Sequence, residues 1–339
     1  MNKDWQRIEA RVRLIRLAIG GWAAQSLFAA NDLGIFELLA RRGPLSADEV
    51  AMALGAHVDA TARLLGALTA MDLLRHGQDG RYANGMAASE FLLPEKDESM
   101  ATWLSLIGHW TQTFGQLADS VRSGHPAELP EEHLGQSADY TRSFVLGMHD
   151  YALGPGRELA RSLDLSDRRS LLDVGGGAGT YSMLLAEAHL SLTCTVWDLP
   201  AAVDVAREVI ARRGLSERIA VAAGDYHVDV FPYGHDAILI SNTLHQEDRA
   251  MCVSILRNAY EALASGGLVV VHAMFLNERG DGPLWPALHN LLMLLVYRGG
   301  RAYTVGQTFE MLIEAGFSDP RHHTMSDFNA GSYVTARKA

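Results

Sequence analysis

Several features that define broad protein classes are missing from this sequence. Only two cysteines occur among the 339 residues, Cys194 and Cys252, and they supply neither a disulfide framework nor a C-x-x-C metal site. No apolar run is long enough to span a membrane, and no basic, apolar and small-residue leader opens the chain. From these absences we expect a cytoplasmic protein without a membrane partner.

The chain also has fewer basic than acidic residues. Lys and Arg number 29 against 40 Asp and Glu, which gives a net charge of −11. Because nucleic acids and anionic membranes attract basic proteins, this balance favours neither as a partner. The composition is otherwise typical of a globular protein, with 48% hydrophobic and 20% charged residues. The length allows two domains with separate cores.

The beginning of the chain predicts a helix with more apolar surface than it can bury. Ile8, Val12, Ile15 and Ile19 recur at the spacing of one helical face. Apolar residues continue at high density as far as Leu39. A single helical layer cannot cover them all, so we expect a second subunit here and predict a homodimer.

Residues 44–82 carry the pattern of a winged helix. Ser46 and Glu49 are spaced as a capping box, and a second helix is expected over residues 59–71. Two short runs then flank an Asp79-Gly80 turn, as in a small hairpin. The pattern predicts an N-terminal, mostly helical domain over residues 1–100.

A winged helix serves either in DNA binding or as a dimerisation or lid module. Arg63 is the one basic side chain of the candidate recognition helix, and Asp59 and Asp72 lie around it. Phosphate contacts need several Lys or Arg residues. We therefore predict a dimerisation domain and no nucleic-acid partner.

The second predicted domain, residues 101–339, has an α/β pattern. Residues 101–165 are helical in pattern, rich in aromatics and suited to lining a substrate pocket. From Ser170 onward, short β-branched runs alternate with helical stretches, which implies a doubly wound parallel sheet. The predicted strands are residues 171–174, 192–197, 219–223, 237–241 and 268–272, with 332–336 as a candidate last strand.

A glycine-rich turn follows the first of these strands. Asp173, Gly175, Gly177 and Gly179 stand at alternate positions. Glycines there let the chain turn sharply and leave backbone N–H groups open to a ligand. A dinucleotide fingerprint is not matched, because Thr180 occupies the position of its third glycine. Alone, the pattern also fits an ordinary tight turn.

Polar residues also end the next three predicted strands. Asp198 ends the second, Gly224-Asp225 follows the third, and Ser241 ends the fourth. Each has an ordinary explanation, such as a helix cap for Asp198 or a turn for Gly224-Asp225. Ligands in open α/β sheets bind at the carboxyl ends of the strands, so the four together favour a cofactor site.

With Trp197-Asp-Leu-Pro, Gly224-Asp225, a histidine after the fourth strand and Tyr260-Glu-Ala-Leu-Ala-Ser-Gly-Gly, the sequence resembles the small-molecule O-methyltransferases. These enzymes use S-adenosylmethionine (SAM), and the caffeic acid, hydroxyindole and bacterial natural-product enzymes typify them. The resemblance covers nearly the whole chain. It implies a Rossmann-like class I methyltransferase domain behind a winged-helix dimerisation domain, and methyl transfer to a hydroxyl of a secondary metabolite.

The resemblance also implies roles for individual residues. The glycine turn with Asp173, Gly175, Gly177 and Gly179 would hold the methionine end of SAM, Asp198 the ribose, and Gly224 and Asp225 the adenine. Three neighbours are weaker candidates for cofactor contacts, namely Leu199, Tyr226 and Ser241.

His245 occupies the position of the family's general base, and an imidazole suits deprotonation of a hydroxyl. The alternative is a histidine that caps the next helix. The acidic partners of the family's histidine are missing: Gln246 replaces the Asp after it, Ala273 stands at the end of the fifth strand, and Arg301-Ala302 replaces x-Glu. These departures leave open a non-catalytic ligand-binding protein on the same fold.

The family's pocket-lining positions hold further histidines, His149 and His289. With His245 they could hold a metal for C-methylation of an α-keto acid, as in some relatives. Alternatively, they hydrogen-bond a polar acceptor, and we expect no metal. The predicted substrate-binding residues are Trp110, Phe144, Met148, His149, His289, Asn290 and Met293.

Overall fold

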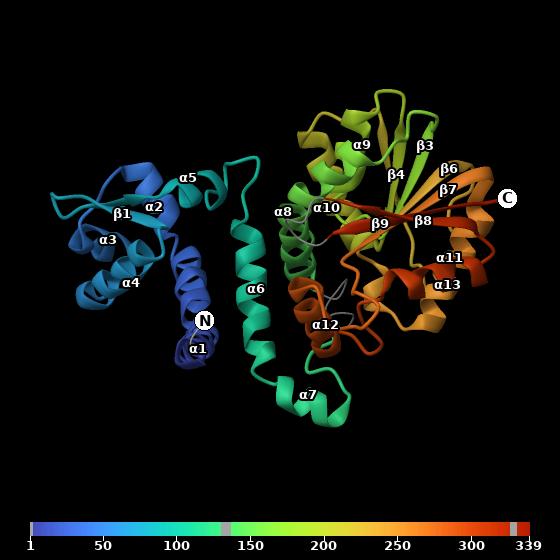
Figure 1. Ribbon diagram of the computed structural model, residues 1–339. Helices are drawn as coiled ribbons and strands as arrows, with labels where there is room; N and C mark the ends of the chain where they lie inside the picture. The colour runs from blue at the N-terminus through green and yellow to red at the C-terminus, as the bar shows by residue number, and fades with distance from the viewer. Residues whose placement is uncertain (1–2, 130–136, 326–330) are drawn as a thin grey trace. The chain divides into compact units, whose positions relative to one another are not determined.

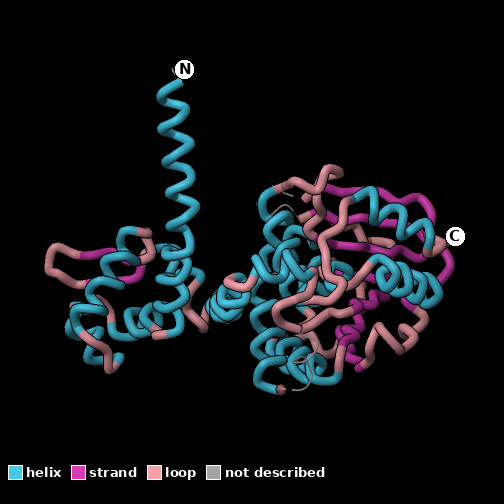
Figure 2. Tube along the Cα trace, turned by 90° about the horizontal axis from the view of Figure 1, so that it is seen from below, coloured by secondary structure: helices cyan, strands magenta, loops and turns pink. Residues whose placement is uncertain are grey.

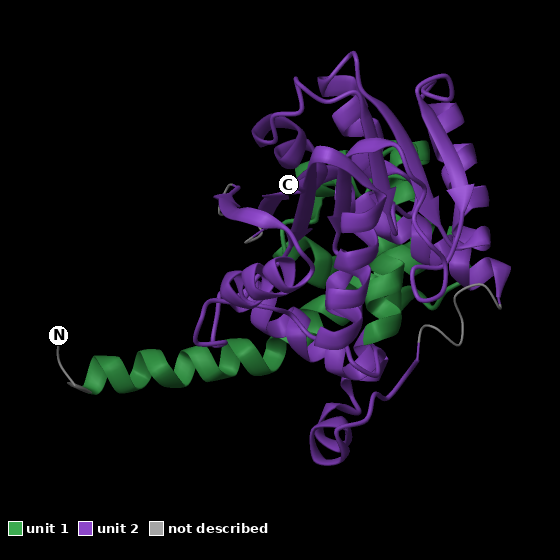
Figure 3. Cartoon of the chain, turned by 90° about the vertical axis from the view of Figure 1, so that its right-hand side faces the viewer, with its two compact units in different colours: residues 1–110 green, residues 111–339 purple. Residues whose placement is uncertain are grey.

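The computed structural model describes residues 3–129, 137–325 and 331–339. Contacts divide the chain into two compact units, residues 1–110 and 111–339 (Figure 3). Each unit has its own hydrophobic core. In the described part of the chain, no helix is both long and apolar enough to cross a membrane.

The first unit is the winged-helix domain expected from the sequence. Its elements are α1 (Lys3–Asp32), α2 (Ile35–Arg42), α3 (Ala47–Leu54), α4 (Val58–Ala70), the antiparallel pair β1 (Leu74–His76) and β2 (Tyr82–Asn84), α5 (Met86–Phe91) and most of α6 (Ala101–Phe114). The capping box is present, because Ser46 N–H donates to Glu49 Oε2 and Glu49 N–H donates to Ser46 Oγ. Phe36, Leu65 and Leu68 are fully buried in its core.

Helix α1 carries apolar side chains that its own unit leaves exposed. Trp5, Leu14, Leu17 and Trp22 are each between 67% and 74% exposed. Figure 2 shows the first turns of α1 as a single helix with no other element of its unit beside them. This surface matches the expectation of unburied apolar surface for the early part of the segment. The later part, which includes Phe36 and Leu39, is instead buried in the core of the unit.

The second unit is built around a seven-stranded sheet in the order β5-β4-β3-β6-β7-β9-β8 (Figure 1). The strands are β3 (Ser170–Val174), β4 (Thr193–Asp198), β5 (Ile219–Ala223), β6 (His235–Ser241), β7 (Leu263–Ala273), β8 (Ser318–Thr324) and β9 (Ser332–Arg337). The first five are parallel. Helices connect β3 to β4, β4 to β5 and β6 to β7, whereas residues 224–234 lead from β5 to β6 without a helix. The predicted doubly wound, Rossmann-like architecture is therefore confirmed.

The alternation of strands and helices had predicted a parallel sheet, but the sheet is not parallel throughout. Strand β9 runs antiparallel to both β7 and β8. The sequence did not indicate β8 at all. This strand lies at the edge of the sheet, its residues are mostly exposed, and it contains Pro320. An edge strand with polar residues and a proline lacks the apolar alternation by which strands are recognised.

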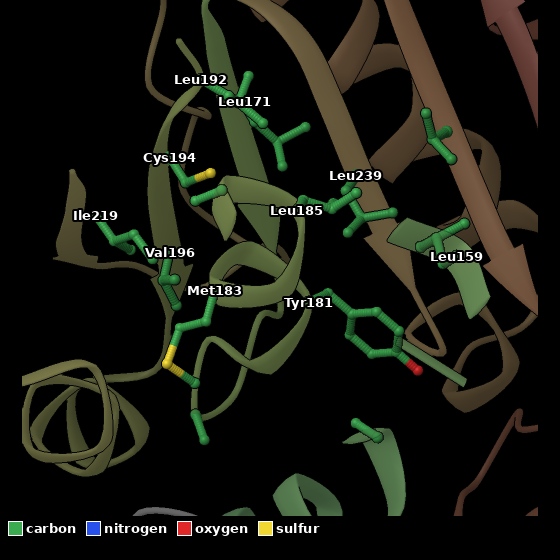
Figure 4. Close-up of a cluster of buried hydrophobic side chains, with 14 of the residues drawn as sticks. Leu159, Leu171, Tyr181, Met183, Leu185, Leu192, Cys194, Val196, Ile219 and Leu239 are labelled. Atoms are coloured by element: carbon green, nitrogen blue, oxygen red, sulfur yellow. The ribbon is translucent and has the colours of Figure 1, made fainter. Parts of the chain in front are cut away.

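Alternation along the inner strands places a core on each face of the sheet. Leu171, Val196 and Leu239 face α8 (Ala138–Ser162), α9 (Thr180–Ala188) and α10 (Pro200–Arg212). In Figure 4, Leu239 lies beside Leu185 of α9, and Val196 lies beside Met183 of the same helix. Leu172 and Ile240 lie in the opposite core, with α11 (Arg249–Ala262) and α13 (Val305–Glu314). The remaining helices of the described residues are α7 (Leu117–Ser123) and α12 (Leu284–Val296), with a 3₁₀ turn at Leu244–Gln246.

Candidate active site

The turn after β3 depends on its glycines. Gly175, Gly177 and Gly179 all have positive φ, at 65°, 54° and 75°. A Cβ atom on Gly175 would lie 2.8 Å from Thr243 Oγ1, whereas nothing lies within 4 Å of a Cβ on Gly177. The turn therefore packs tightly against the loop after β6 at Gly175. At Gly177 it borders open space that a ligand can use.

Asp198, at the end of β4, holds this turn in place. Its Oδ2 accepts a hydrogen bond from Gly177 N–H at 2.7 Å, and its Oδ1 accepts one from Leu199 N–H at 2.7 Å. Burial raises the pKa of this carboxyl, and the two N–H donors oppose that shift. Leu199 rather than Asp198 is the N-cap residue of α10. The carboxylate is thus tied to the glycine turn and is not a helix cap.

Asp173 lies behind the turn, with 1% of its surface exposed. Its Oδ2 accepts a hydrogen bond from Ser182 Oγ at 2.7 Å, and its Oδ1 has no partner among the described residues. Burial raises the pKa of this carboxyl to about 6. Asp173 therefore supports the turn from within the fold.

The residues after β5 form a second polar group at the same edge. Gly224 lies against the Trp197 indole so closely that a Cβ atom there would overlap the ring. Asp225 Oδ1 accepts from His227 Nδ1 at 2.9 Å, and Glu247 Oε1 accepts from Tyr226 OH at 2.9 Å and His227 Nε2 at 3.0 Å. Neither His227 nor Glu247 was among the site residues predicted from the sequence.

His245 lies in the 3₁₀ turn that follows β6. It is not a helix cap, because Asp248 caps α11 by accepting from Met251 N–H at 2.9 Å. The imidazole has no hydrogen-bond partner among the described residues, and the His289 ring stands edge-on to it at 4.6 Å between centroids. Burial, and then the neighbouring His289, lower the pKa of His245 well below its usual value. The ring is therefore neutral at pH 7.

The segment 299–304 holds the His245 turn through hydrogen bonds to the backbone carbonyls of that turn. Arg301 N–H donates to His245 O at 2.8 Å, and Tyr303 OH donates to Glu247 O at 2.8 Å. A Cβ atom on Gly300 would lie 3.2 Å from His245 O, so glycine permits this close approach. The segment is anchored in turn by Asn290, whose Oδ1 accepts from Ala302 N–H at 2.8 Å.

A small cavity lies against His245, and alanines occupy two positions of its lining. These are Ala273 and Ala302, the positions at which the resemblance led us to expect carboxylates. Apart from His245, the other lining residues are apolar or hydroxyl-bearing, namely Leu244, Val271, Met274, Phe275, Tyr303 and Thr308. The missing acidic partners of His245 are thus replaced by a small, largely apolar space.

The other candidate pocket residues are divided among several helices. His149 Nδ1 lies 2.7 Å from Thr180 Oγ1, and burial lowers its pKa to about 4. Phe144 and Met148 are half-buried on α8, Met293 is buried on α12, and Trp110 on α6 is 6% exposed. Within the described ranges, no group of three His, Cys, Asp or Glu residues is arranged to hold a metal ion.

A buried polar cluster joins the ends of β6 and β7. Ser241 Oγ lies 2.8 Å from His272 Nδ1, and Asn242 Nδ2 donates to Tyr181 OH at 3.3 Å. Burial lowers the pKa of His272 to about 4. Ser241, expected beside the cofactor, thus contacts His272, which was not among the predicted site residues.

Comparison with known proteins identifies both units. The O-methyltransferase domain family matches residues 114–318, and the O-methyltransferase dimerisation domain family matches residues 15–94. A 3-hydroxy-5-methyl-1-naphthoate 3-O-methyltransferase of Streptomyces sahachiroi is 35% identical over 96% of this chain and 95% of its own length.

Two further similarities bear on the chemistry. An L-tyrosine C(3)-methyltransferase of Streptomyces lavendulae is 30% identical over 89% of this chain and 85% of its own length. The crystal structure of human N-acetylserotonin methyltransferase in complex with SAM has a TM-score of 0.90 and 28% identity, and the alignment covers 97% of this chain and 98% of that one. Together with the fold and the strand-end site, these matches show that the chain belongs to the SAM-dependent O-methyltransferase family.

Proposed function

We propose that this methyltransferase acts on an acidic aromatic hydroxyl of a small secondary metabolite, with His245 as the base. The observation that carries the proposal is the environment of His245, a neutral imidazole without a carboxylate partner. The naphthoate acceptor named for the relative from S. sahachiroi, an aromatic acid, supports the substrate class.

The strand-end residues fit SAM. Open space at Gly177 lies beside the Asp198 carboxylate, which suits a ribose, and Asp225 follows the outermost parallel strand, which suits the adenine. Gly175, Gly177 and Gly179 would receive the methionine end, with Asp173 behind them. Bound there, SAM supplies an electrophilic methyl group. The protein's part is to align the acceptor and to remove its proton.

The low pKa of His245 sets a condition on the acceptor. A weakly basic imidazole removes a proton efficiently only from a hydroxyl whose own pKa is low. Burial and the nearby His289 disfavour the imidazolium that results, and no carboxylate offsets this. A phenol made acidic by its ring substituents meets the condition, and an aliphatic alcohol does not. Phe144, Met148 and Met293 would supply apolar contacts, and His149, His289 and Asn290 polar ones.

Methylation of a ring carbon is the second candidate function. It is favoured by the relative named as an L-tyrosine C(3)-methyltransferase. A phenolate can accept the methyl group at oxygen or at the adjacent ring carbon, so the same proton removal serves both outcomes. Metal-assisted methylation of an α-keto acid has no ligand group to support it in the described residues. NMR of the methylated product distinguishes oxygen from carbon.

Replacing the base tests whether the protein is an enzyme or a binding module. His245→Gln should lower methyl transfer by about two to four orders of magnitude, because general-base catalysis is worth that much. Transfer is measured with labelled SAM and a panel of hydroxynaphthoates and phenols, and binding of S-adenosylhomocysteine (SAH) by calorimetry should not change. His57→Gln, at an exposed position of the first unit, is the control. No transfer by the wild type to any acceptor, with SAH bound, would support the binding module.

The negative charge of Asp198, at the proposed ribose position, can be removed with little change in the shape of the side chain. Asp198→Asn should weaken SAH binding by about 1–3 kcal/mol, because a charge-assisted hydrogen bond and the support of the Gly177 turn are both weakened. Calorimetry gives the affinity. Asp204→Asn, at an exposed position of α10, should bind SAH as the wild type does. Equal affinity of Asp198→Asn and the wild type would remove Asp198 from the cofactor site.

Restoring a carboxylate beside the base should broaden the acceptor range. Ala302→Glu places an acid in the cavity, raises the pKa of His245 and should increase transfer to weakly acidic phenols by about tenfold. The acid limb of kcat/KM should move to higher pH, because a base with a raised pKa stays protonated to higher pH. Ala302→Gln is the uncharged control, and Ala273→Asp is a smaller alternative. An unchanged pH profile in both acidic variants would contradict the assigned role of the cavity.

We also propose that the chain is a homodimer through α1. The dimerisation-domain match and the exposed apolar residues of that helix support this. Leu17→Glu should shift the protein toward monomer, because a charge would have to be buried in the contact. Light scattering at micromolar concentration gives the mass, and Gln6→Glu adds the same charge at an exposed polar position. A wild-type monomer would refute the proposal.

A further inference from the structure

An imidazole bridges two carboxylates that belong to different loops of the sheet edge. His227 Nδ1 lies 2.9 Å from Asp225 Oδ1, and His227 Nε2 lies 3.0 Å from Glu247 Oε1. Ionised carboxylates only accept hydrogen bonds, so both ring nitrogens must carry a hydrogen. The ring is therefore an imidazolium. Its hydrogen bonds to Glu247 and then to Asp225 raise the pKa of His227 to about 9, against the opposing effect of burial.

The bridge crosses a wide part of the sheet. Asp225 follows β5 and Glu247 follows the end of β6, while β4 and β3 lie between these strands. Three strand spacings amount to about 14 Å. Tyr226 strengthens the link, since its OH donates to Glu247 Oε1 at 2.9 Å and its ring is tilted against that of His227, with centroids 4.5 Å apart. The bridge therefore ties together the two loops on either side of the glycine turn and Asp198.

The His227 bridge fixes one carboxylate oxygen of Asp225 and leaves the other available to accept a hydrogen bond. Asp225 Oδ1 accepts from both the backbone N–H and the ring Nδ1–H of His227, each at 2.9 Å. Oδ2 has no hydrogen-bond partner in the part of the chain that the structure describes. An exocyclic amino group such as that of adenine needs one oriented acceptor, and Oδ2 can supply it.

We propose that His227 is a positioning residue of the cofactor site, which orients Asp225 toward the adenine and couples it through Glu247 to the segment that carries His245. The proposal rests on the proposed function, in which Asp225 contacts the adenine. Beyond that function, it assigns a role to His227, which acts on the cofactor through Asp225, and it predicts how cofactor affinity depends on pH. The groups that face the imidazolium are Asp225, Glu247 and Tyr226, and Asp229 accepts from Asp225 N–H at 2.9 Å.

The bridge can be opened from either end without freeing the loop. Asn258 Oδ1 still accepts from Phe231 N–H, and Asn258 Nδ2 still donates to Asp229 O, so the segment stays anchored to α11. His227→Gln and Glu247→Gln should each weaken SAH binding about tenfold at pH 7.5, measured by calorimetry. Because the two side chains act through one contact, the double variant should lose little more than either single variant.

The pH dependence separates positioning from simple packing. His227 is charged near neutral pH and loses a proton as the pH rises through about 9, which leaves one N–H donor for two carboxylates. Wild-type SAH affinity should therefore fall through this range more steeply than that of His227→Gln. His227→Arg keeps several donors and a permanent charge. It should bind SAH nearly as the wild type does at pH 7.5 and hold that affinity above pH 9.

Two results would overturn the proposal. One is SAH affinity within about twofold of the wild type for both folded single variants, and the other is an alkaline affinity profile that His227→Gln leaves unchanged. Asp225→Asn distinguishes the causes. If it loses SAH binding while the bridge variants keep it, the adenine site stands and the bridge fails. If it binds SAH normally, the placement of the adenine is wrong, and the bridge proposal fails with it.

Discussion

The parallel pairing of β3 with β4 on one side and with β6 on the other determines where this protein can bind a cofactor. Crossover helices leave in opposite directions from this point, so the strand ends border an open crevice. The glycine turn, Asp198 and the His245 turn all follow strands of this group. The Gly177–Asp198 hydrogen bond and the contact of Gly175 with Thr243 then join the three loops into one surface. The proposed cofactor site and the proposed base, His245, therefore depend on the same backbone geometry.

The surroundings of His245, the proposed base, determine how basic its ring can be. Backbone contacts from Arg301 and Gly300 hold the His245 turn, while alanines at 273 and 302 leave its ring without a carboxylate. Burial then keeps the imidazole neutral and weakly basic. A rigid but weak base is suited to an acceptor that is already acidic. The proposed preference for an acidic acceptor thus rests on the residues that line one small cavity.

Much of the fold could be predicted because inner strands and capped helices leave strong local patterns. The buried strands, the Ser46–Glu49 capping box and the glycine turn were all evident from spacing. Strand β8 was not, because an exposed edge strand need not alternate. The rule that ligands gather at strand ends led us to predict Asp198, Asp225 and His245 as site residues, and the structure places all three at that edge of the sheet. The same rule could have drawn attention to Glu247, two residues after His245, which was not among the predicted site residues.

Contacts between residues that are far apart in the chain could not be predicted from the sequence. His227 and Glu247 are twenty positions apart and meet only because two loops turn toward each other over β3 and β4. The cavity at Ala273 and Ala302 is likewise formed by segments distant in the chain. The family resemblance indicated which acidic residues were absent. The cavity in their place could be recognised only from the three-dimensional structure.

The central claim is that His245 works as a neutral, weakly basic imidazole. Its most direct test is a titration of the His245 ring by nitrogen-15 NMR in the SAH-bound protein, with His245→Gln used to assign the signal. The account predicts an apparent pKa well below 6.5, with the ring neutral throughout the range in which methyl transfer is measured. A pKa at or above 6.5 would contradict it and would mean that the missing carboxylates are replaced by a partner that stabilises the imidazolium.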